Sequence, residues 1–337
     1  STTAPPASRP PMLPPPLFNT PPATPPSAST DSPSGNINME RFLNNQVLSD
    51  VEFVLRPGSD RVPRAIKAHR QFLAMRNEVF FTKFFLNEPD QRRFFVDDLH
   101  PDGFYGLLKY LYSGVFRPSS FEEAMHTRVA AEQYLDVDLI DACSKYIADH
   151  LTPERVCPLL DCLGTTDVGL IDKAAITMLK NSGASVLRSD TFVNSSDTTL
   201  KVILDVVAGV PETLVIDSVR RWALEKCRRV LYADKTLMTL EQAMRPFLPQ
   251  LRFLSLSPED YVRGPGSWAI LRDRENYAIL GNLIEPSSFR LPSWTSHEYT
   301  ARSQFHRPYR VASPRVDVPE TRLPPSSGSS VSSRDSG

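Results

Sequence analysis

Asp50 and His69 form the pair of side chains in this sequence that most resembles a catalytic carboxylate and imidazole. Asp50 comes just before an alternating apolar run at residues 51–55, and His69 closes a second run at 64–69. A carboxylate beside an imidazole can orient it as a general base. That chemistry also needs a positioned nucleophile or a metal. The sequence contains neither a G-x-S-x-G turn nor an H-E-x-x-H pattern, so the motifs favour a structural role for the pair.

A cysteine is the other conceivable nucleophile, with His150 as its base. Cys157 and Cys162 follow His150, but both fall in a leucine-rich helical stretch, where a buried and inert thiol is expected. The sequence has no C-x-x-C pair and no His/Cys cluster with zinc-ligand spacing. We therefore expect no enzyme, no cofactor and no metal site. The reduced thiols of Cys143, Cys157, Cys162 and Cys227 indicate an intracellular protein, cytoplasmic or also nuclear.

The elements that must position Asp50 and His69 are predicted within residues 36–150. The runs at 51–55 and 64–69 form a hairpin around Pro-Gly and Ser-Asp turn residues, and a third short strand is predicted at 92–98. Residues 71–85 have helical spacing, with a stripe of Phe72, Met75, Val79 and Phe80. Further helices are predicted at 101–113, ending at Gly114, at 121–135 and at 139–151. The sum is a small α+β unit.

Residues 151–290 predict a stack of short helices packed as antiparallel pairs. Pro153, Pro211 and Pro258 each stand at a helix start, and Gly183 and Gly209 are expected to end helices. No strand pattern of useful length intervenes. We therefore expect an all-α unit with a core of its own.

The two ends of the chain have a different composition. Residues 1–35 are mostly Pro, Ser, Thr and Ala and predict a disordered Pro-rich tail, and residues 291–337 predict a disordered Ser/Pro-rich tail. The Pro-rich tail could bind an SH3 or WW domain, although most such tails are linkers. Net charge is −1 and no run of about 18 apolar residues occurs, so neither nucleic acid nor a membrane is an expected partner. The chain begins at Ser1, which leaves open that it is part of a longer protein.

Three motifs in the first unit resemble the BTB/POZ domain. They are Ser49-Asp50-Val51, Ala68-His69-Arg70 and Tyr110-Leu111-Tyr112-Ser113-Gly114, in the order and spacing of that family. The stretches "VIDSVRRWALEKC" and "LRFLSLSPEDYVRGP" are similar to the BACK domain that follows BTB in Kelch-like and related proteins. The resemblance implies an α+β BTB/POZ domain at 36–150, then an all-α BACK stack of helical hairpins at 151–290, as in the BTB-BACK proteins without Kelch repeats.

The resemblance implies that the BTB/POZ domain forms a self-complementary dimer. Asp50 and His69 are structural in the family and lie close to the interface. The seam is expected at Met39, Phe42, Leu43 and Val47, although these residues could instead close the monomer core.

Many BTB-BACK proteins are substrate adaptors for cullin-3 ubiquitin ligases, and the resemblance implies that role with an unidentified protein substrate. The family's apolar-x-Glu triplet falls at Pro89-Asp90-Gln91, where Gln91 replaces the glutamate; the register Leu86-Asn87-Glu88 has the right types a turn earlier. Losing one charge-assisted hydrogen bond costs about 1.5–3 kcal/mol. The alternative is a non-ligase BTB dimer scaffold in developmental, cytoskeletal or transcriptional complexes. The implied cullin contacts are Phe85, Pro89, Asp90, Gln91, Tyr134, Leu135 and Leu159.

Overall fold

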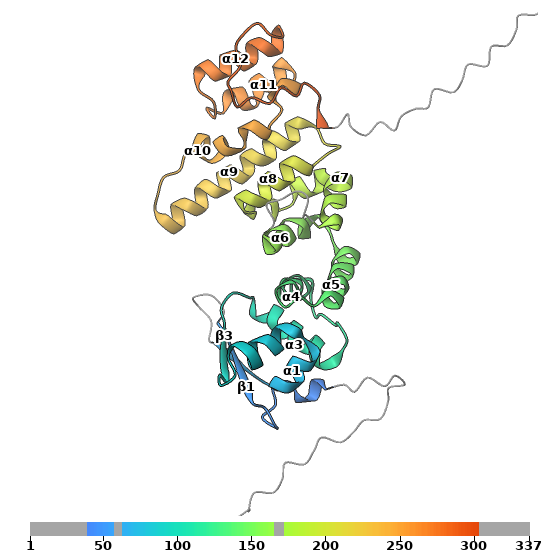
Figure 1. The fold of residues 1–337 in the computed structure, drawn as a ribbon. Coiled ribbons are helices and arrows are strands. Elements are labelled where there is room, and N and C mark those ends of the chain that lie inside the picture. The colour runs from blue at the N-terminus through green and yellow to red at the C-terminus, as the bar shows by residue number, and fades with distance from the viewer. Residues whose placement is uncertain (1–38, 57–62, 165–171, 303–337) are drawn as a thin grey trace, which may run out of the picture.

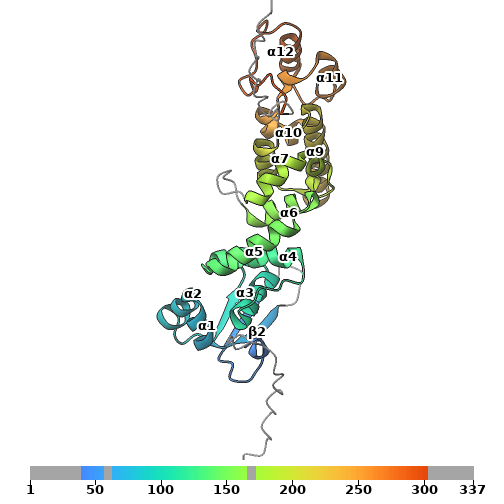
Figure 2. The same ribbon diagram turned by 90° about the vertical axis from the view of Figure 1, so that its right-hand side faces the viewer.

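The computed structural model describes residues 39–56, 63–164 and 172–302. A small sheet covered by helices occupies one end, and a long stack of helices extends away from it (Figures 1 and 2). The expected fold class, an α+β unit followed by an all-α unit, is confirmed. The two predicted tails lie outside the described residues, except for residues 291–302. Among the described helices, none has the length and apolar character that a membrane span requires.

Three strands form the sheet, with Asp50 just before one strand and His69 just after another. The strands β1 (Val51–Leu55), β2 (Arg64–Ala68) and β3 (Arg93–Val96) stand in the order β2-β1-β3. The central strand β1 pairs antiparallel with β2 and parallel with β3, and Phe53 is the partner of both Ile66 and Phe94. All three of these side chains are buried, which fixes the register because a slip of one residue would turn them to the opposite face.

Helices close over the sheet and bury a cluster of aromatic rings. The ring of Phe53 lies 5.0 Å from that of Phe104 and 5.7 Å from that of Phe80, and Phe80 is 4.6 Å from Tyr134. Such tilted and edge-on contacts add to the stability that area burial supplies. The helices of this unit are α1 (Arg70–Arg76), α2 (Glu78–Phe81), a π-helical turn (Thr82–Asn87), α3 (Pro101–Ser113), α4 (Phe121–Gln133) and α5 (Val137–His150), after a 3₁₀ turn at Glu40–Phe42.

The predicted continuous helix over residues 71–85 is wrong. Asn77 adopts an extended conformation with φ −151° and ψ 126°, which separates α1 from α2. Its side-chain oxygen accepts hydrogen bonds from the amides of Val79 and Phe80, and its Nδ2 donates to the carbonyl of Tyr134 at 2.8 Å. Because α1 ends at this break, Met75 and Phe80 do not share one helical face. Met75 is exposed, whereas Phe80 is buried in the core.

Close packing of α3 on α4 depends on a glycine. A Cβ at Gly106 would lie 2.1 Å from Oγ1 of Thr127, a distance that no side chain tolerates. The same helix α3 starts after His100, has Pro101 at its first position and ends at Gly114 with φ 72°. The predicted boundaries of this helix are therefore confirmed.

The second unit is a stack of helices around buried Trp222. The indole nitrogen of Trp222 donates to the carbonyl of Ser195 at 2.9 Å, and its ring packs edge-on against Phe247. The helices are α6 (Pro153–Leu163), α7 (Lys173–Arg188), α8 (Asp197–Val206), α9 (Glu212–Asp234), α10 (Leu240–Met244), α11 (Pro258–Arg263) and α12 (Asp273–Ile284), with 3₁₀ turns at Phe192–Asn194, Arg245–Gln250, Phe253–Ser255 and Pro265–Ser267.

Gly183 does not end its helix as predicted. The backbone kinks at Ser182, with φ −130° and ψ 26°, and α7 then continues to Arg188. A Cβ at Gly183 would lie 2.7 Å from Cγ2 of Val207, so the glycine serves close packing between segments here. A glycine in a helical pattern has both uses, and the sequence alone does not separate them.

The two units share one hydrophobic core at their junction. Phe121 and Met125 of α4 pack in the same buried cluster as Val156 of α6. Arg128 of α4 also forms an ion pair with Asp172, which caps the start of α7. Figure 1 shows α4 and α5 between the sheet and α6. A continuous core of this kind holds the helical stack in a defined orientation on the first unit.

The prediction of a disordered tail from residue 291 is wrong for residues 291–302. Trp294 donates from its indole nitrogen to Glu275 at 2.9 Å. Arg302 is buried, forms an ion pair with Glu212 and donates to the carbonyls of Leu204 and Gln250. The segment has little apolar periodicity, so the sequence pattern did not predict its order. Contacts of Trp294 and Arg302 hold it on the helical unit.

The low pKa of Glu275 predicts that the folded protein loses stability in acid. It accepts two hydrogen bonds from the guanidinium of Arg245, at 2.8 and 2.6 Å, and these hold the pKa of its carboxyl at about 2, below the usual 4.5. Its stabilising effect is thus complete above about pH 4.5 and is lost as the pH falls towards 2, with a slope of up to about 1.4 kcal/mol per pH unit.

We expect Glu275→Gln to lower the unfolding midpoint at pH 7 and to bring variant and unmodified protein together only below about pH 2, the pKa of the folded state. Denaturant unfolding at a series of pH values measures this. Glu259→Gln, at an exposed carboxylate of α11, is the control and should run parallel to the unmodified protein. A constant gap between Glu275→Gln and the unmodified protein over the whole range would contradict the assignment.

Candidate protein-binding surfaces

The hydrogen bonds of Asp50 and His69 give both side chains a structural role. Asp50 accepts from the amide of Arg70 at 2.7 Å. On His69, Nε2 lies 2.8 Å from the carbonyl of Val47, and Nδ1 lies 2.8 Å from the hydroxyl of Tyr112. A carbonyl only accepts, so Nε2 donates to Val47; the Tyr112 hydroxyl accepts from the His69 amide and is also hydrogen-bonded to Nδ1. Both ring nitrogens are thus used in joining β2 to α3 and to the loop before β1.

Neither cysteine near residue 160 is paired with His150. His150 bonds the carbonyl of Tyr146 through Nδ1, whereas Cys162 lies 3.4 Å from Nδ1 of His126. Burial raises the pKa of the Cys157 thiol to about 12 and that of Cys162 to about 11. Thiols with such raised pKa values are poor nucleophiles at neutral pH. Within the described ranges, no group of three or more His, Cys, Asp or Glu side chains could hold a metal ion.

A pocket of about 310 Å³ lies beside His69, and we call it the seam pocket. It brings together Met39, Phe42, Asp50 and His69 of the predicted dimer interface. Val47 is exposed next to it. Leu43, by contrast, is buried in the monomer core, which fits the alternative role of closing that core. The full lining is Met39, Phe42, Leu48, Asp50, His69, Gln71, Phe72, Met75 and Tyr112.

Leu48 and Met75 are apolar members of this surface that the sequence did not reveal. Leu48 is 84% exposed and Met75 71% exposed. Leu48 also has a left-handed backbone, with φ 58°, a conformation that leucine rarely adopts. Nothing in the local pattern signals a left-handed leucine, and the exposure of Met75 follows from the break at Asn77.

A second, larger hollow of about 590 Å³ lies between α2 with its π-helical turn and the end of α4. We call it the loop groove. Its most exposed apolar side chain is Leu135, which is 74% exposed and has φ 53°. Phe85 and Leu86 of the π-helical turn are also exposed nearby in the chain. The lining is Asn77, Glu78, Val79, Thr82, Lys83, Asn87, Glu88, Tyr134 and Leu135.

The loop groove contains residues of only one of the two sequence registers considered for a cullin contact. Asn87 and Glu88 line it, whereas Pro89, Asp90 and Gln91 lie beyond it. Gln91 instead donates from Nε2 to the carbonyl of Arg93 at 3.0 Å. Of the two registers, only Leu86-Asn87-Glu88 has members that line the loop groove, namely Asn87 and Glu88.

Two other predicted contact residues are mainly part of the core. Tyr134 lines the bottom of the loop groove but is largely buried against Phe80. Leu159 is fully buried in the core of the helical unit, because that face of α6 packs inward, and it offers no surface to a partner. Burial of this kind depends on which neighbouring helices cover α6, and the periodicity of one helix does not show it.

Comparison with known proteins identifies the first unit. Residues 39–151 match the BTB/POZ domain. The chain is 25% identical over 238 residues to human BTB/POZ domain-containing protein 6, and 28% identical over 241 residues to zebrafish BTB/POZ domain-containing protein 6-A. Both matches cover 70% of this chain, and 44% and 43% of those relatives. BTB/POZ domain-containing protein 9 of Drosophila melanogaster is 27% identical over 223 residues, 63% of this chain and 30% of that relative.

The aligned stretches are longer than the matched domain, so the similarity continues into the helical unit. The chain spans less than half the length of these relatives. BTB/POZ domains generally dimerise and bind protein partners. The sheet order, the hydrogen bonds of Asp50 to Arg70 and of His69 to Tyr112, and the family match agree: residues 39–151 of this chain are a BTB/POZ domain.

Proposed function

We propose that the chain is a dimeric, non-catalytic adaptor that binds the N-terminal domain of cullin-3 through the loop groove and holds a protein substrate on its helical unit, a BACK domain. The observation that carries the proposal is Leu135. A left-handed conformation costs an ordinary residue about 1–2 kcal/mol, and an exposed leucine gains no burial energy in return. A partner that buries this side chain would recover about 1.5–3 kcal/mol.

The backbone around Leu135 explains why the side chain is presented so firmly. The amide of Asp136 bonds the carbonyl of Ala131 at 2.9 Å, which closes the end of α4 in the manner of a left-handed cap. Glycine or asparagine is the usual residue there. Leucine at this position is unfavourable for the monomer and points to a role outside it.

The other side of the loop groove supplies the second half of the contact. The π-helical turn Thr82–Asn87 ends at Glu88 and leaves Leu86 exposed. π-helical turns occur frequently at functional sites. Leu86 and Glu88 thus offer an apolar anchor and a carboxylate, which are the two groups of the family's apolar-x-Glu contact.

The shared core between the two units supports the adaptor role. An adaptor must hold a substrate at a fixed orientation to the cullin, and Phe121, Met125 and Val156 join the BTB/POZ domain to the helical stack without a flexible linker. The seam pocket supports dimerisation, because exposed Leu48 and Met75 would be buried by a second copy. Two copies would double the valency for substrate and cullin.

We expect Leu135→Asn to weaken binding of the cullin-3 N-terminal domain at least tenfold, because about 1.5–3 kcal/mol of apolar burial is lost. Asparagine tolerates φ 53° better than leucine does, so the thermal midpoint should stay or rise. Leu237→Asn is the matched control, since Leu237 is 78% exposed in the helical unit. Equal affinity of both variants in a competition assay would remove the loop groove from the proposal.

A non-ligase BTB dimer scaffold in developmental, cytoskeletal or transcriptional complexes is the second candidate. The observation that favours it is Gln91, which bonds its own loop in place of the expected glutamate. In this case the dimer would form and cullin-3 would not bind. A cytoplasmic or also nuclear location, and an SH3 or WW partner for residues 1–35, remain proposals; that tail lies outside the described residues.

A further inference from the structure

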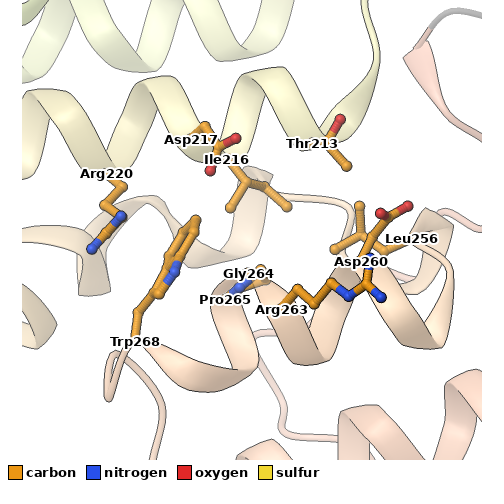
Figure 3. A pocket seen from close by; sticks show the side chains of 10 residues that line it. All are labelled: Thr213, Ile216, Asp217, Arg220, Leu256, Asp260, Arg263, Gly264, Pro265 and Trp268. Carbon is orange, nitrogen blue, oxygen red and sulfur yellow. The ribbon is translucent and has the colours of Figure 1, made fainter.

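A third hollow, of about 370 Å³, lies in the helical unit, remote in sequence from both surfaces of the BTB/POZ domain. We call it the charged groove. Figure 3 shows α9 along one side and α11 with the following turn along the other. Arg220 and Trp268 stand at one end, and Thr213, Asp260 and Arg263 stand at the other. The lining is Thr213, Ile216, Asp217, Arg220, Leu256, Asp260, Arg263, Gly264, Pro265 and Trp268.

The wall of the charged groove is rigidly built. Tyr261 is fully buried and donates from its hydroxyl to Asn276 at 2.6 Å, while Nδ2 of Asn276 donates to the carbonyl of Gly266 at 2.8 Å. This fixes the turn that returns the chain from α11 to Trp268. A Cβ at Gly264 would lie 2.9 Å from the carbonyl of Asp260, so only glycine allows so tight a return. The groove is therefore formed before any ligand arrives.

The charged groove holds two arginines and two aspartates that form no ion pair with one another, although the charge of Arg220 acts to lower the pKa of the Asp217 carboxyl against the rise caused by burial. Within the part of the chain that the structure describes, none of Asp217, Arg220, Asp260 and Arg263 forms an ion pair. Elsewhere in the same unit, oppositely charged groups do pair, as Lys226 does with Asp197 and Arg245 with Glu275. The four groups are thus available to a ligand.

The ring of Trp268 orients the side chain of Arg220 at one end of the charged groove. Its guanidinium lies over the ring of Trp268, 4.5 Å from the centroid, and its Nε atom is buried without a hydrogen-bond partner among the described residues. A stacked guanidinium loses little freedom when it binds a carboxylate. Desolvation by burial raises the pKa of the Asp217 carboxyl, so that carboxylate would gain from a cationic partner.

We infer that the charged groove binds an extended peptide segment of a protein partner, with one acidic and one basic side chain flanking an apolar residue. Two arginines and two aspartates give the lining no net charge, which disfavours a purely acidic or purely basic ligand. Ile216, Leu256 and Pro265 supply an apolar middle. From Thr213 to Arg220 the helix spans about 10 Å, the length of three or four extended residues.

The inference is independent of cullin-3, because the charged groove and the loop groove share no residue. It concerns the same helical unit that the proposed function assigns to substrate. A chain that binds peptide and not cullin-3 would keep the inference and remove the ligase role.

The test is selection of phage-displayed random 12-residue peptides on the immobilised full chain. We expect enriched peptides with an acidic and a basic residue two or three positions apart around an apolar one. Synthetic copies should bind by fluorescence anisotropy and lose at least tenfold in affinity with Asp217→Lys or Arg263→Glu. Both sites are exposed, so the variants should fold, which thermal unfolding checks. Arg274→Glu, at an exposed arginine of α12, is the matched control and should bind normally.

A charge exchange sharpens the test. A peptide whose basic residue is replaced by an acidic one should bind Asp217→Lys better than the unmodified protein. The inference is overturned if no peptide is enriched, or if the selected peptides bind both variants as tightly as the unmodified chain. It is also overturned if a synthetic peptide of residues 303–337 displaces them at lower concentrations than their own, because the occupant is then this chain's own segment.

Discussion

Replacing Arg302 with alanine is expected to lower the free energy of unfolding of the helical unit by about 3–5 kcal/mol. Arg302 is 4% exposed, pairs with Glu212 and donates to the carbonyls of Leu204 at 3.1 Å and Gln250 at 2.8 Å. Removing it leaves the buried Glu212 carboxylate with the amide of Arg252, at 2.9 Å, as its remaining hydrogen-bond donor within the described ranges. An uncompensated buried charge is among the most costly defects in a protein.

Denaturant unfolding followed by circular dichroism measures the loss. Arg290→Ala is the matched control, because Arg290 lies at an exposed position before the same segment, and we expect a change within about 0.5 kcal/mol. The double variant Arg302→Met with Glu212→Met should be far less destabilised than Arg302→Ala, because no buried charge remains. A loss below about 1 kcal/mol for Arg302→Ala would mean that residues 291–302 contribute little to the helical unit.

Phe80→Ala is expected to destabilise the BTB/POZ domain by about 3–5 kcal/mol. Phe80 is fully buried, and its ring lies 5.7 Å from Phe53, 5.4 Å from Phe84 and 4.6 Å from Tyr134. The cavity left by the ring would be bounded by other rings on an ordered sheet, so it would collapse only in part. Because Tyr134 precedes Leu135, the loop groove should also lose its shape.

Phe81→Ala is the control for this second prediction, since Phe81 is the adjacent residue and is 46% exposed. Its cost should be under about 1 kcal/mol by the same denaturant titration. Similar costs for Phe80→Ala and Phe81→Ala would show that the aromatic cluster does not form the core of the domain.

The sequence predicts those elements whose ends carry local signals. Helix α3 runs from Pro101 to Ser113 and is capped by Gly114 as expected, and α11 begins after Ser257, whose side chain accepts from the amide of Asp260 at 3.0 Å. Proline, a capping hydroxyl and a left-handed glycine act within one turn of chain, so their effect is readable without the rest of the molecule.

Features that depend on distant partners were not predictable. The break at Asn77 is fixed by the carbonyl of Tyr134, and the order of residues 291–302 by Glu212 and Glu275. Leu159 faces the core because of the helices around α6. Each of these outcomes requires knowledge of which segment lies opposite, and that information is absent from local periodicity.

The candidate sites show the same division. Asp50, His69 and Leu135 were predicted through family motifs, and the structure places the first two at the seam pocket and the third at the loop groove. Leu48 and the charged groove around Trp268 were missed. A left-handed leucine and a set of unpaired charges become visible only when backbone angles and side-chain neighbours are known.

Calorimetric titration of the full chain with the N-terminal domain of cullin-3 tests the proposed adaptor function. We expect a dissociation constant of about 1 µM or tighter, one cullin per protomer, and at least a tenfold loss with Leu135→Asn. Sedimentation of the same sample establishes whether the chain is folded and dimeric. No binding heat at about 50 µM from a folded dimer would rule out the adaptor function, since such weakness corresponds to a loss of about 2 kcal/mol or more.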